Sequence, residues 1–293
     1  MVDRSFSRRI FHFMNILFFI VYSLICLIPI IYVFSMSLSS SVAVSAGKLV
    51  LWPVDFTLRS YQYVMQRPEF WDGMRISIYR VLLGVSINMI MIIFAAFPLS
   101  KTQMEFSGKN FFVWFFIITM LFSGGIVSTY MIVRYTKLLN TIWALVLPGA
   151  VPVFYVVLLM NFFKTIPREL EESALMDGAG YFTILFRIYV PVSMAAIATL
   201  VVFTMVGHWN SWFDGMIYMS DARKYPLQTY LQSILITNTT RQASRAQAIL
   251  MRLISDRTVK AAQVFIAMIP VLIVYPFLQR YFVTGITLGS VKE

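Results

Sequence analysis

The 293-residue chain has few charged residues, and this shortage decides its class. Asp, Glu, Lys and Arg make up 13% of the sequence, whereas hydrophobic residues make up 59%. A soluble domain carries about 25% charged residues, so the composition excludes an ordinary soluble protein. Cysteine is also scarce, because the single residue Cys26 leaves no internal disulfide and no metal site built on cysteines. We therefore expect an integral membrane protein.

Six long apolar runs are expected to cross the membrane as helices. Each has roughly the 20 residues that a span needs, and backbone polar groups in lipid must be satisfied within the segment. Arg4, Arg8 and Arg9 precede the first run and favour a cytoplasmic N-terminus. Six spans then return the C-terminus to the cytoplasm, so the predicted fold is all-α and polytopic. The runs are approximately residues 10–34, 74–99, 111–132, 141–163, 190–213 and 259–282.

The predicted spans lack the groups that several kinds of membrane chemistry require. They hold essentially no acidic residue away from their ends, which counts against a secondary transporter coupled to protons or sodium. They also hold no nucleophile cluster and no paired acids, which counts against a membrane enzyme. The Gly-Lys pairs at 47–48 and 108–109 lack the earlier glycine and the following hydroxyl of a phosphate-binding loop. We therefore expect no ATP hydrolysis by this chain.

The parts on the predicted outer side include two long loops, at about residues 35–73 and 214–258. Pro226 begins a segment in the second loop whose apolar residues have helical spacing. On this topology 14 of the 24 Lys and Arg residues face outward. They are either solvated and headgroup-contacting charges or a field that attracts an anionic ligand.

A break is expected within the fourth run, where Pro148, Gly149 and Pro152 interrupt the apolar sequence. Neighbouring helices can satisfy the backbone groups that such a break frees. Broken helices often border a translocation path, and a purely structural kink is equally common.

The segment ELEESALMDGAG, residues 169–180, is acidic although it lies between two hydrophobic segments on the predicted cytoplasmic side. Pro167 suits the first position of a helix, the carboxylates suit its first turns, and Gly178 predicts its end. Such a short helix is not stable alone, so it must pack on something. It is either an ordinary cytoplasmic loop or a docking element for a soluble partner.

An amphipathic helix is expected to begin at Tyr181, directly after this segment, and Pro191 marks the start of the next span. Its apolar side chains have the spacing of one helical face. They are Phe182, Leu185, Phe186 and Tyr189.

The segment EESALMDGAGYFTILFRIYVP resembles the EAA motif of permease subunits in binding-protein-dependent ABC importers. That motif reads Glu-Ala-Ala, three residues, Gly, nine residues, Ile-x-Leu-Pro. Ser173 replaces the first alanine and Val190 replaces the leucine, while the spacing is kept. The segment GHWNSWFDGMIYMSD is similar to the fifth span of carbohydrate permeases, and the tail YPFLQRYFVTGITLGSVKE resembles the end of the same branch. The matching positions of the EAA motif are Glu172, Ser173, Ala174, Gly178, Ile188, Val190 and Pro191.

The resemblance implies the type I ABC importer permease fold, with six transmembrane helices and a cytoplasmic coupling helix. Residues 1–68 would form the N-terminal helix and first outer loop, residues 69–285 the transmembrane domain, and residues 286–293 a cytoplasmic tail. The protein would be a permease subunit in the bacterial cytoplasmic (inner) membrane. Its partners would be a second homologous permease, two ATP-binding subunits and an extracytoplasmic solute-binding protein.

The same resemblance implies import of a carbohydrate, an oligosaccharide. The long first outer loop, the basic outer face and the chain end resemble permeases for oligosaccharides from polymers, alginate among them, so an acidic sugar is one expected substrate. This chain would not be an enzyme and would bind no cofactor, because ATP and Mg would be held by the partner ATPase subunits. A permease for amino acids or peptides and a secondary transporter remain the alternatives.

Two sets of site residues are expected, and neither includes a catalytic residue or a metal ligand. The polar and aromatic groups at membrane depth either line the substrate path or form packing hydrogen bonds. Residues expected to dock the ATPase subunit are Glu171, Glu172, Ser173, Ala174, Asp177, Gly178 and Ala179. Residues expected along the substrate path are Asn88, Asn161, His208, Trp209, Asn210 and Trp212.

Overall fold

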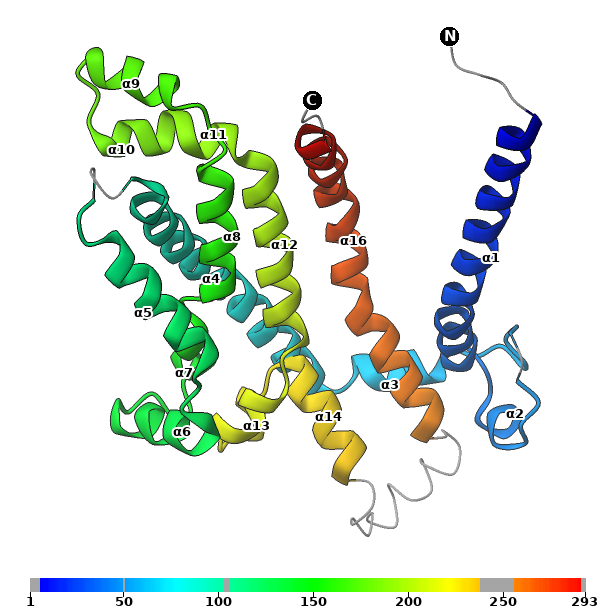
Figure 1. Ribbon diagram of the computed structural model, residues 1–293. Coiled ribbons are helices and arrows are strands. Elements are labelled where there is room, and N and C mark those ends of the chain that lie inside the picture. The colour runs from blue at the N-terminus through cyan, green and yellow to red at the C-terminus, as the bar shows by residue number, and fades with distance from the viewer. Residues whose placement is uncertain (1–5, 50, 103–105, 238–255, 291–293) are drawn as a thin grey trace. The chain divides into compact units, whose positions relative to one another are not determined.

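The computed structural model describes residues 6–49, 51–102, 106–237 and 256–290 of the chain (Figure 1). Those residues form helices and connecting segments, with no strand among them. The chain divides into two compact units. Unit 1 holds residues 1–68 and 234–269, and unit 2 holds residues 69–233 and 270–293.

Unit 1 contains α1 (Phe6–Ser37), α2 (Ser41–Ser45), α3 (Arg59–Met65) and the first part of α16 (Asp256–Ser290). The apolar part of α1 has a mean hydropathy of 2.8, and no residue in its most apolar stretch is buried within the protein. A helix that is apolar on all sides is typical of a membrane span.

The C-terminal end of α1 is fixed by hydrogen bonds to the segments that follow it. The Ser35 hydroxyl donates to the Leu51 carbonyl at 2.5 Å, and the Ser37 and Tyr61 hydroxyls lie 2.7 Å apart. Burial raises the pKa of the Tyr61 phenol above its usual value, and the hydrogen bond to Ser37 offsets part of that rise. The first predicted outer loop is therefore a folded segment that contains two short helices.

Unit 2 contains the remaining helices. The longest, α4, starts at Pro68 and continues without interruption to Ser100. The others, in chain order, are α5 (Lys109–Leu121), α6 (Gly125–Tyr135), α7 (Ile142–Val146), η1 (Leu147–Gly149), α8 (Val153–Phe163), α9 (Arg168–Met176), α10 (Tyr181–Ile184), the π-helix η2 (Leu185–Tyr189), α11 (Val190–Val192), α12 (Met194–Asn210), α13 (Phe213–Tyr218), η3 (Ala222–Lys224) and α14 (Leu227–Thr237). The helix predicted after Pro226 is confirmed as α14.

The main core of unit 2 lies between α4, α8, the α10–η2 segment and α12. Side chains at its centre are fully buried, including Ile92, Leu159, Phe163 and Ile184. The Tyr189 ring packs edge-on against Phe97 and Phe163, with ring centroids 5.0 Å and 5.3 Å apart. In lipid such close packing holds helices together, because apolar burial there has little driving force of its own.

In the part of the chain that the structure describes, three helices are long and apolar enough to cross a membrane by themselves, and the number rises to as many as six if each bent helix pair counts as one span. The pairs bend by 112° between α5 and α6, by 48° between α7–η1 and α8, and by 81° between α10–α11 and α12. The predicted break at residues 148–152 is confirmed.

The prediction of one continuous helix over residues 111–132 is wrong. The chain turns at residues 122–124, and Gly125 has φ +77°, a conformation that other residues rarely adopt. The run at 190–213 also differs, because its helix α12 starts at Met194 and ends at Asn210.

Three of the four amphipathic side chains predicted after Tyr181 contact rings of α4, because Phe182 and Phe186 pack against Phe94 and Tyr189 packs against Phe97. Leu185 and Tyr189 are buried, whereas Phe182 and Phe186 are exposed. Residues Leu185–Tyr189 form a π-helix, whose wider turn departs from the 3.6-residue period on which the prediction depends.

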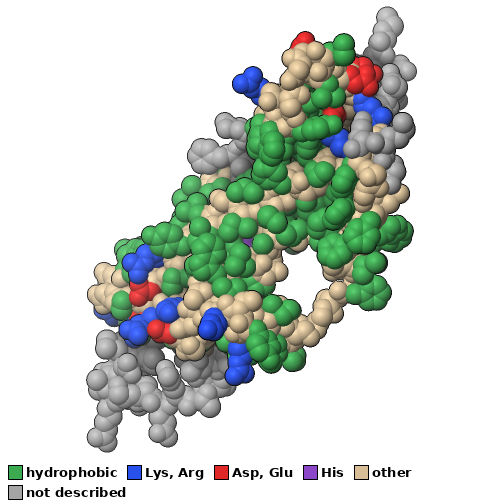
Figure 2. Space-filling view, turned by 90° about the vertical axis from the view of Figure 1, so that its left-hand side faces the viewer, with side chains coloured by type: hydrophobic (Ala, Val, Ile, Leu, Met, Phe, Trp, Pro, Cys, Tyr) green, Lys and Arg blue, Asp and Glu red, His purple; other side chains and the backbone are tan. Residues whose placement is uncertain are grey.

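The distribution of charge on the surface fits a membrane protein. On the face shown in Figure 2, Lys, Arg, Asp and Glu side chains gather at the two ends, and hydrophobic side chains cover most of the region between them.

Candidate functional site

The predicted acidic helix is present as α9, Arg168–Met176. Pro167 occupies the position just before the helix, so the helix starts one residue later than predicted. Glu169 and Glu171 lie in its first turn, where carboxylates are favoured. Gly178 ends the helix with φ +78°, and the Ala179 amide donates to the Ala174 carbonyl at 2.9 Å. This is the glycine-dependent helix end that the sequence predicts.

The residues predicted to dock an ATPase subunit divide between two faces of α9 and its turn. Exposed side chains belong to Glu172, Ser173 and Asp177, and Gly178 is exposed as well. The remaining three residues face their own chain. Glu171 is buried, while Ala174 and Ala179 pack against the main core of unit 2.

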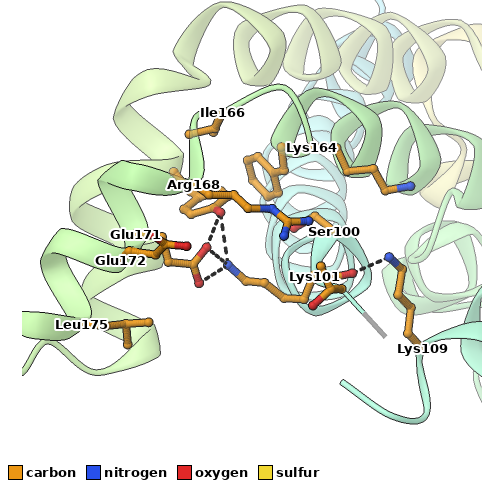
Figure 3. A pocket seen from close by; sticks show the side chains of 12 residues that line it. Ser100, Lys101, Lys109, Lys164, Ile166, Arg168, Glu171, Glu172 and Leu175 are labelled. Carbon is orange, nitrogen blue, oxygen red and sulfur yellow. Dashed lines mark hydrogen bonds and ion pairs between the residues drawn. The ribbon is translucent and has the colours of Figure 1, made fainter. Parts of the chain in front are cut away.

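The buried face of α9 is held by an ion pair with the residue that follows α4 (Figure 3). The Lys101 Nζ lies 2.5 Å and 2.6 Å from the two Glu171 carboxylate oxygens. The Tyr189 hydroxyl donates to Glu171 Oε2 at 2.6 Å, and Lys101 Nζ lies 3.2 Å from the same hydroxyl. The side chains of Lys101 and Glu171 are only 8% and 10% exposed.

Aromatic rings complete the surroundings of the ammonium group. Lys101 Nζ lies 4.1 Å from the centre of the Phe97 ring and 4.3 Å from that of Tyr189, within the range of cation–π attraction. Ionised groups taken out of water need such compensation, because their desolvation is costly. The Lys101–Glu171 ion pair is therefore a fixed connection between α4 and α9.

A cavity of about 240 Å³ opens beside this connection. Figure 3 shows Lys101, Lys109, Lys164, Arg168, Glu171 and Glu172 around it. The Lys109 ammonium donates to the Lys101 carbonyl at the edge of the cavity. Four cations against two carboxylates make the surroundings of this cavity basic.

The sequence did not predict the part that Lys101 and Tyr189 play. A single lysine at the end of an apolar run is typical of a cation at the membrane interface, and Tyr189 was assigned only to an amphipathic face. Their meeting with Glu171 depends on sequence separations of 70 and 18 residues. No local signal in the sequence could have found it.

The predicted path residues Asn88 and His208 are brought together in the structure. The Asn88 amide nitrogen donates to the carbonyls of Gly149 and Ala150 at 2.7 Å and 2.9 Å. Its oxygen lies 2.7 Å from His208 Nε2. Asn88 thereby satisfies carbonyls at the break between η1 and α8 while it fixes the His208 ring.

The other four path candidates do not share one environment. Trp209 is buried, whereas Asn161, Asn210 and Trp212 are exposed. Asn161 lies on α8, and the other three lie at or just after the end of α12. Asn88 and His208 are thus joined by an interhelical hydrogen bond, while three of the predicted path side chains are exposed.

A second ion pair, partly buried and not predicted from the sequence, connects α4 with the first turn of α13. The Arg80 guanidinium, 3% exposed, pairs with Asp214 and also donates to the Leu145 carbonyl at 3.4 Å. Asp214 in turn accepts from the Ser211 hydroxyl and the Gly215 amide, each at 2.9 Å. Within the described residues, no group of three or more His, Cys, Asp or Glu side chains could hold a metal ion.

These features define a class of protein. Apolar helices that are long or bent in pairs, with an acidic helix that ends in a glycine turn, indicate a polytopic membrane protein. No protein-family model matches it.

Comparisons with individual proteins identify the family. The chain is 36% identical to the protein LplC of Bacillus subtilis (strain 168), over 98% of this chain and 96% of LplC. It is 34% identical to the polygalacturonan/rhamnogalacturonan transport system permease protein YtcP of the same organism, over 98% of this chain and 99% of YtcP. A solved bacterial ABC transporter involved in the import of the acidic polysaccharide alginate has a chain with a TM-score of 0.86 and 33% identity, covering 96% of this chain and 100% of that one.

The chain therefore belongs to the family of carbohydrate ABC transporter permeases. The predicted family, the all-α membrane fold and the function as a carbohydrate importer permease are confirmed, and the amino-acid alternative is not supported. The relatives are permease subunits, which are not themselves enzymes.

Proposed function

We propose that this permease imports an acidic oligosaccharide. YtcP is named for polygalacturonan and rhamnogalacturonan transport, and the structural neighbour takes part in alginate import. The outward-facing excess of Lys and Arg on the expected topology supports the same substrate class, because a positive field raises the local concentration of anions.

The chain works within a larger assembly in the bacterial cytoplasmic membrane, with both termini in the cytoplasm. A second homologous permease completes the membrane part as a heterodimer, and a solute-binding protein delivers the sugar from outside. Two ATP-binding subunits hold ATP and Mg and hydrolyse the nucleotide. This chain contributes the path for the sugar and the surface that receives those subunits.

The observation that carries the docking proposal is an exposed acidic surface on a firmly held helix. Glu172, Ser173, Asp177 and Gly178 are exposed and form the contact surface for an ATP-binding subunit, with Glu172 at the edge of the cavity. The inward-facing Glu171, Ala174 and Ala179 hold that surface in place. A partner surface with basic groups opposite Glu172 and Asp177 would be complementary in charge, which gives register and specificity.

The sugar path uses the polar groups near α12. Trp212, Asn210 and Asn161 offer an aromatic face and amide groups, which suit the apolar faces and hydroxyls of a sugar. Asn88, His208 and Trp209 shape the wall behind them through packing and hydrogen bonds.

The substrate proposal is tested in liposomes that contain the whole complex. Uptake of oligouronates is compared with that of neutral oligosaccharides of equal length, at low and high salt. We expect ATP-dependent uptake of oligouronates that weakens with salt, because screening reduces the attraction between exposed charges. Uptake of neutral sugars only would overturn the acidic substrate class.

The docking proposal is tested by Glu172→Lys, which reverses one exposed charge on α9. Binding of the ATP-binding subunits should weaken by about tenfold, the equivalent of about 1.4 kcal/mol. Glu69→Lys makes the same charge change at an exposed position on the first turn of α4 and serves as the control. Equal binding by the Glu172→Lys variant and the wild type would contradict docking through this surface.

A further inference from the structure

We propose that the Lys101–Glu171 ion pair is the connection through which movement of α9 is passed to α4 during the transport cycle. The inference rests on the proposed docking function of α9. Lys101 and Glu171 then act as positioning residues, since they are buried and contact neither the sugar nor the face of α9 that meets the ATP-binding subunit.

The polar side-chain connection between α9 and the membrane helices passes through Glu171. It has nine residues, which is too short for a stable isolated helix. Among residues 168–176, all of which the structure describes, Glu171 is the one whose side chain hydrogen-bonds to another helix. The Ser173 hydroxyl donates within α9, to the Glu169 carbonyl.

The geometry of the contact between Lys101 and Glu171 joins the two residues closely. Both carboxylate oxygens of Glu171 lie within 2.6 Å of the Lys101 ammonium, and Tyr189 contacts both partners. The Phe97 and Tyr189 rings beside the ammonium belong to the main core of unit 2. Separation of a buried ion pair leaves uncompensated charges, so a displaced α9 moves the end of α4 with it.

The α4 helix leads from Lys101 toward the wall of the proposed sugar path. Lys101 directly follows this 33-residue helix. Asn88 and Arg80 precede Lys101 by 13 and 21 residues, which at 1.5 Å per residue is about 20 Å and about 32 Å along the helix axis. Asn88 binds the carbonyls of the broken helix and His208, and Arg80 binds Asp214. One continuous helix therefore connects α9 with the wall of the proposed sugar path and with the first turn of α13.

An ion pair that only stabilises the fold would make the same contacts. The test must therefore separate effects on folding and docking from effects on the transmission of movement from α9 to α4. Removing one charge alone would leave the other buried and unpaired, and such a variant could fail to fold. The double variant Lys101→Met/Glu171→Gln removes both charges at similar volume and keeps an acceptor for the Tyr189 hydroxyl. Asp72→Asn/Arg75→Gln is the control, because it removes an exposed ion pair of 2.9 Å from the other end of α4.

Each variant is assembled in liposomes with the second permease, the ATP-binding subunits and the solute-binding protein. Three quantities are measured: thermal stability, the affinity for the ATP-binding subunits, and sugar taken up per ATP hydrolysed. The sugar is whichever class the wild type imports, oligouronates or neutral oligosaccharides. The conservative variant Lys101→Arg keeps the cation and is measured alongside.

We expect the double variant to bind the ATP-binding subunits within about threefold of wild type, because the exposed face of α9 is unchanged, a difference of about 0.6 kcal/mol. Sugar taken up per ATP should fall by about tenfold or more. The Lys101→Arg variant should keep most of the wild-type sugar uptake per ATP. The Asp72→Asn/Arg75→Gln control should match wild type.

Three results would overturn the proposal. These are wild-type coupling in the double variant, a loss of ATPase-subunit binding in it, and an equal loss of coupling in the control. The first result would show that the ion pair does not pass on the movement. The second would show that the pair only supports the docking surface. The third would show that loss of any ion pair on α4 reduces coupling, so that the effect is not specific to Lys101 and Glu171. Failure of the docking proposal itself looks different, because Glu172→Lys would then bind the ATP-binding subunits as wild type does.

Discussion

The Asn88 side chain lies between the break in one helix and the imidazole of another, with its oxygen 2.7 Å from His208 Nε2. Its amide nitrogen donates to two carbonyls, of Gly149 and Ala150, so its oxygen must accept. The His208 Nε2 therefore carries the proton in this arrangement. One side chain fixes the orientation of the break, the tautomer of the histidine and the separation of α4 from α12.

Asn88→Leu should destabilise the protein because it leaves the two carbonyls and the His208 N–H without partners. Each polar group left unsatisfied where water does not replace the lost bond costs about 1–3 kcal/mol. Thermal unfolding in detergent measures the loss. Ser86→Ala is the control, since the Ser86 hydroxyl donates only within its own helix, at 2.7 Å, and is exposed. A melting temperature for Asn88→Leu equal to that of the control would show that the carbonyls find other partners.

Gly84 is required by the same histidine. A Cβ at this position would lie 2.6 Å from His208 Cδ2, which is closer than atoms can approach. Gly84→Ala should therefore cost about 1–3 kcal/mol, as overpacking generally does.

A double-mutant cycle identifies the cause. In a His208→Ala background, Gly84→Ala should cost less than about 0.5 kcal/mol, because the ring that the new Cβ meets is gone and residues in contact are not additive. Gly207→Ala serves as the control, since a Cβ there meets nothing within 4 Å. An equal cost of Gly84→Ala in both backgrounds would show that the histidine is not what excludes the side chain.

The fold could be predicted from the sequence to the extent that it depends on local patterns. The apolar runs, the break near Pro148 and Pro152, and the α9 helix with its Gly178 end are all visible as composition, spacing or turn residues. The bend at Gly125 was missed because apolar length alone indicated a continuous span. The π-helix at Leu185–Tyr189 was missed because the period was assumed to be regular.

The site could be predicted less completely, because its connections are between distant residues. The motif positions around Glu172 were found by resemblance, whereas the partners Lys101 and Tyr189 were not. Glu171 looks like its acidic neighbours in the sequence, yet it is buried and they are exposed. Which glutamate of a short helix faces inward depends on the position of a cation 70 residues away.

The Arg80–Asp214 ion pair gives a prediction about the N-terminal half of α4. Asp214→Ala should destabilise the protein by about 3–5 kcal/mol, because it leaves the buried guanidinium uncompensated. Arg80→Met/Asp214→Asn should be much less harmful, since the amide oxygen introduced by Asp214→Asn still accepts from Ser211 and Gly215. Asp72→Ala, which breaks an exposed pair, should cost about 0–1 kcal/mol. Unfolding in detergent ranks the variants, and a double variant worse than Asp214→Ala would reject a charge-based explanation.

The turn after α9 allows conformation to be separated from packing. Gly178 has φ +78° and Gly180 has φ −76°, and a Cβ added at either position meets nothing within 4 Å. Gly178→Ala should therefore cost about 1–2 kcal/mol through the left-handed conformation alone, while Gly180→Ala should be neutral. The strain lies directly beside the proposed docking surface, so the ATP-binding subunits should bind the Gly178→Ala variant more weakly. Binding titrations with both variants check this, and equal binding by both would show that the turn is free to change its conformation in the complex.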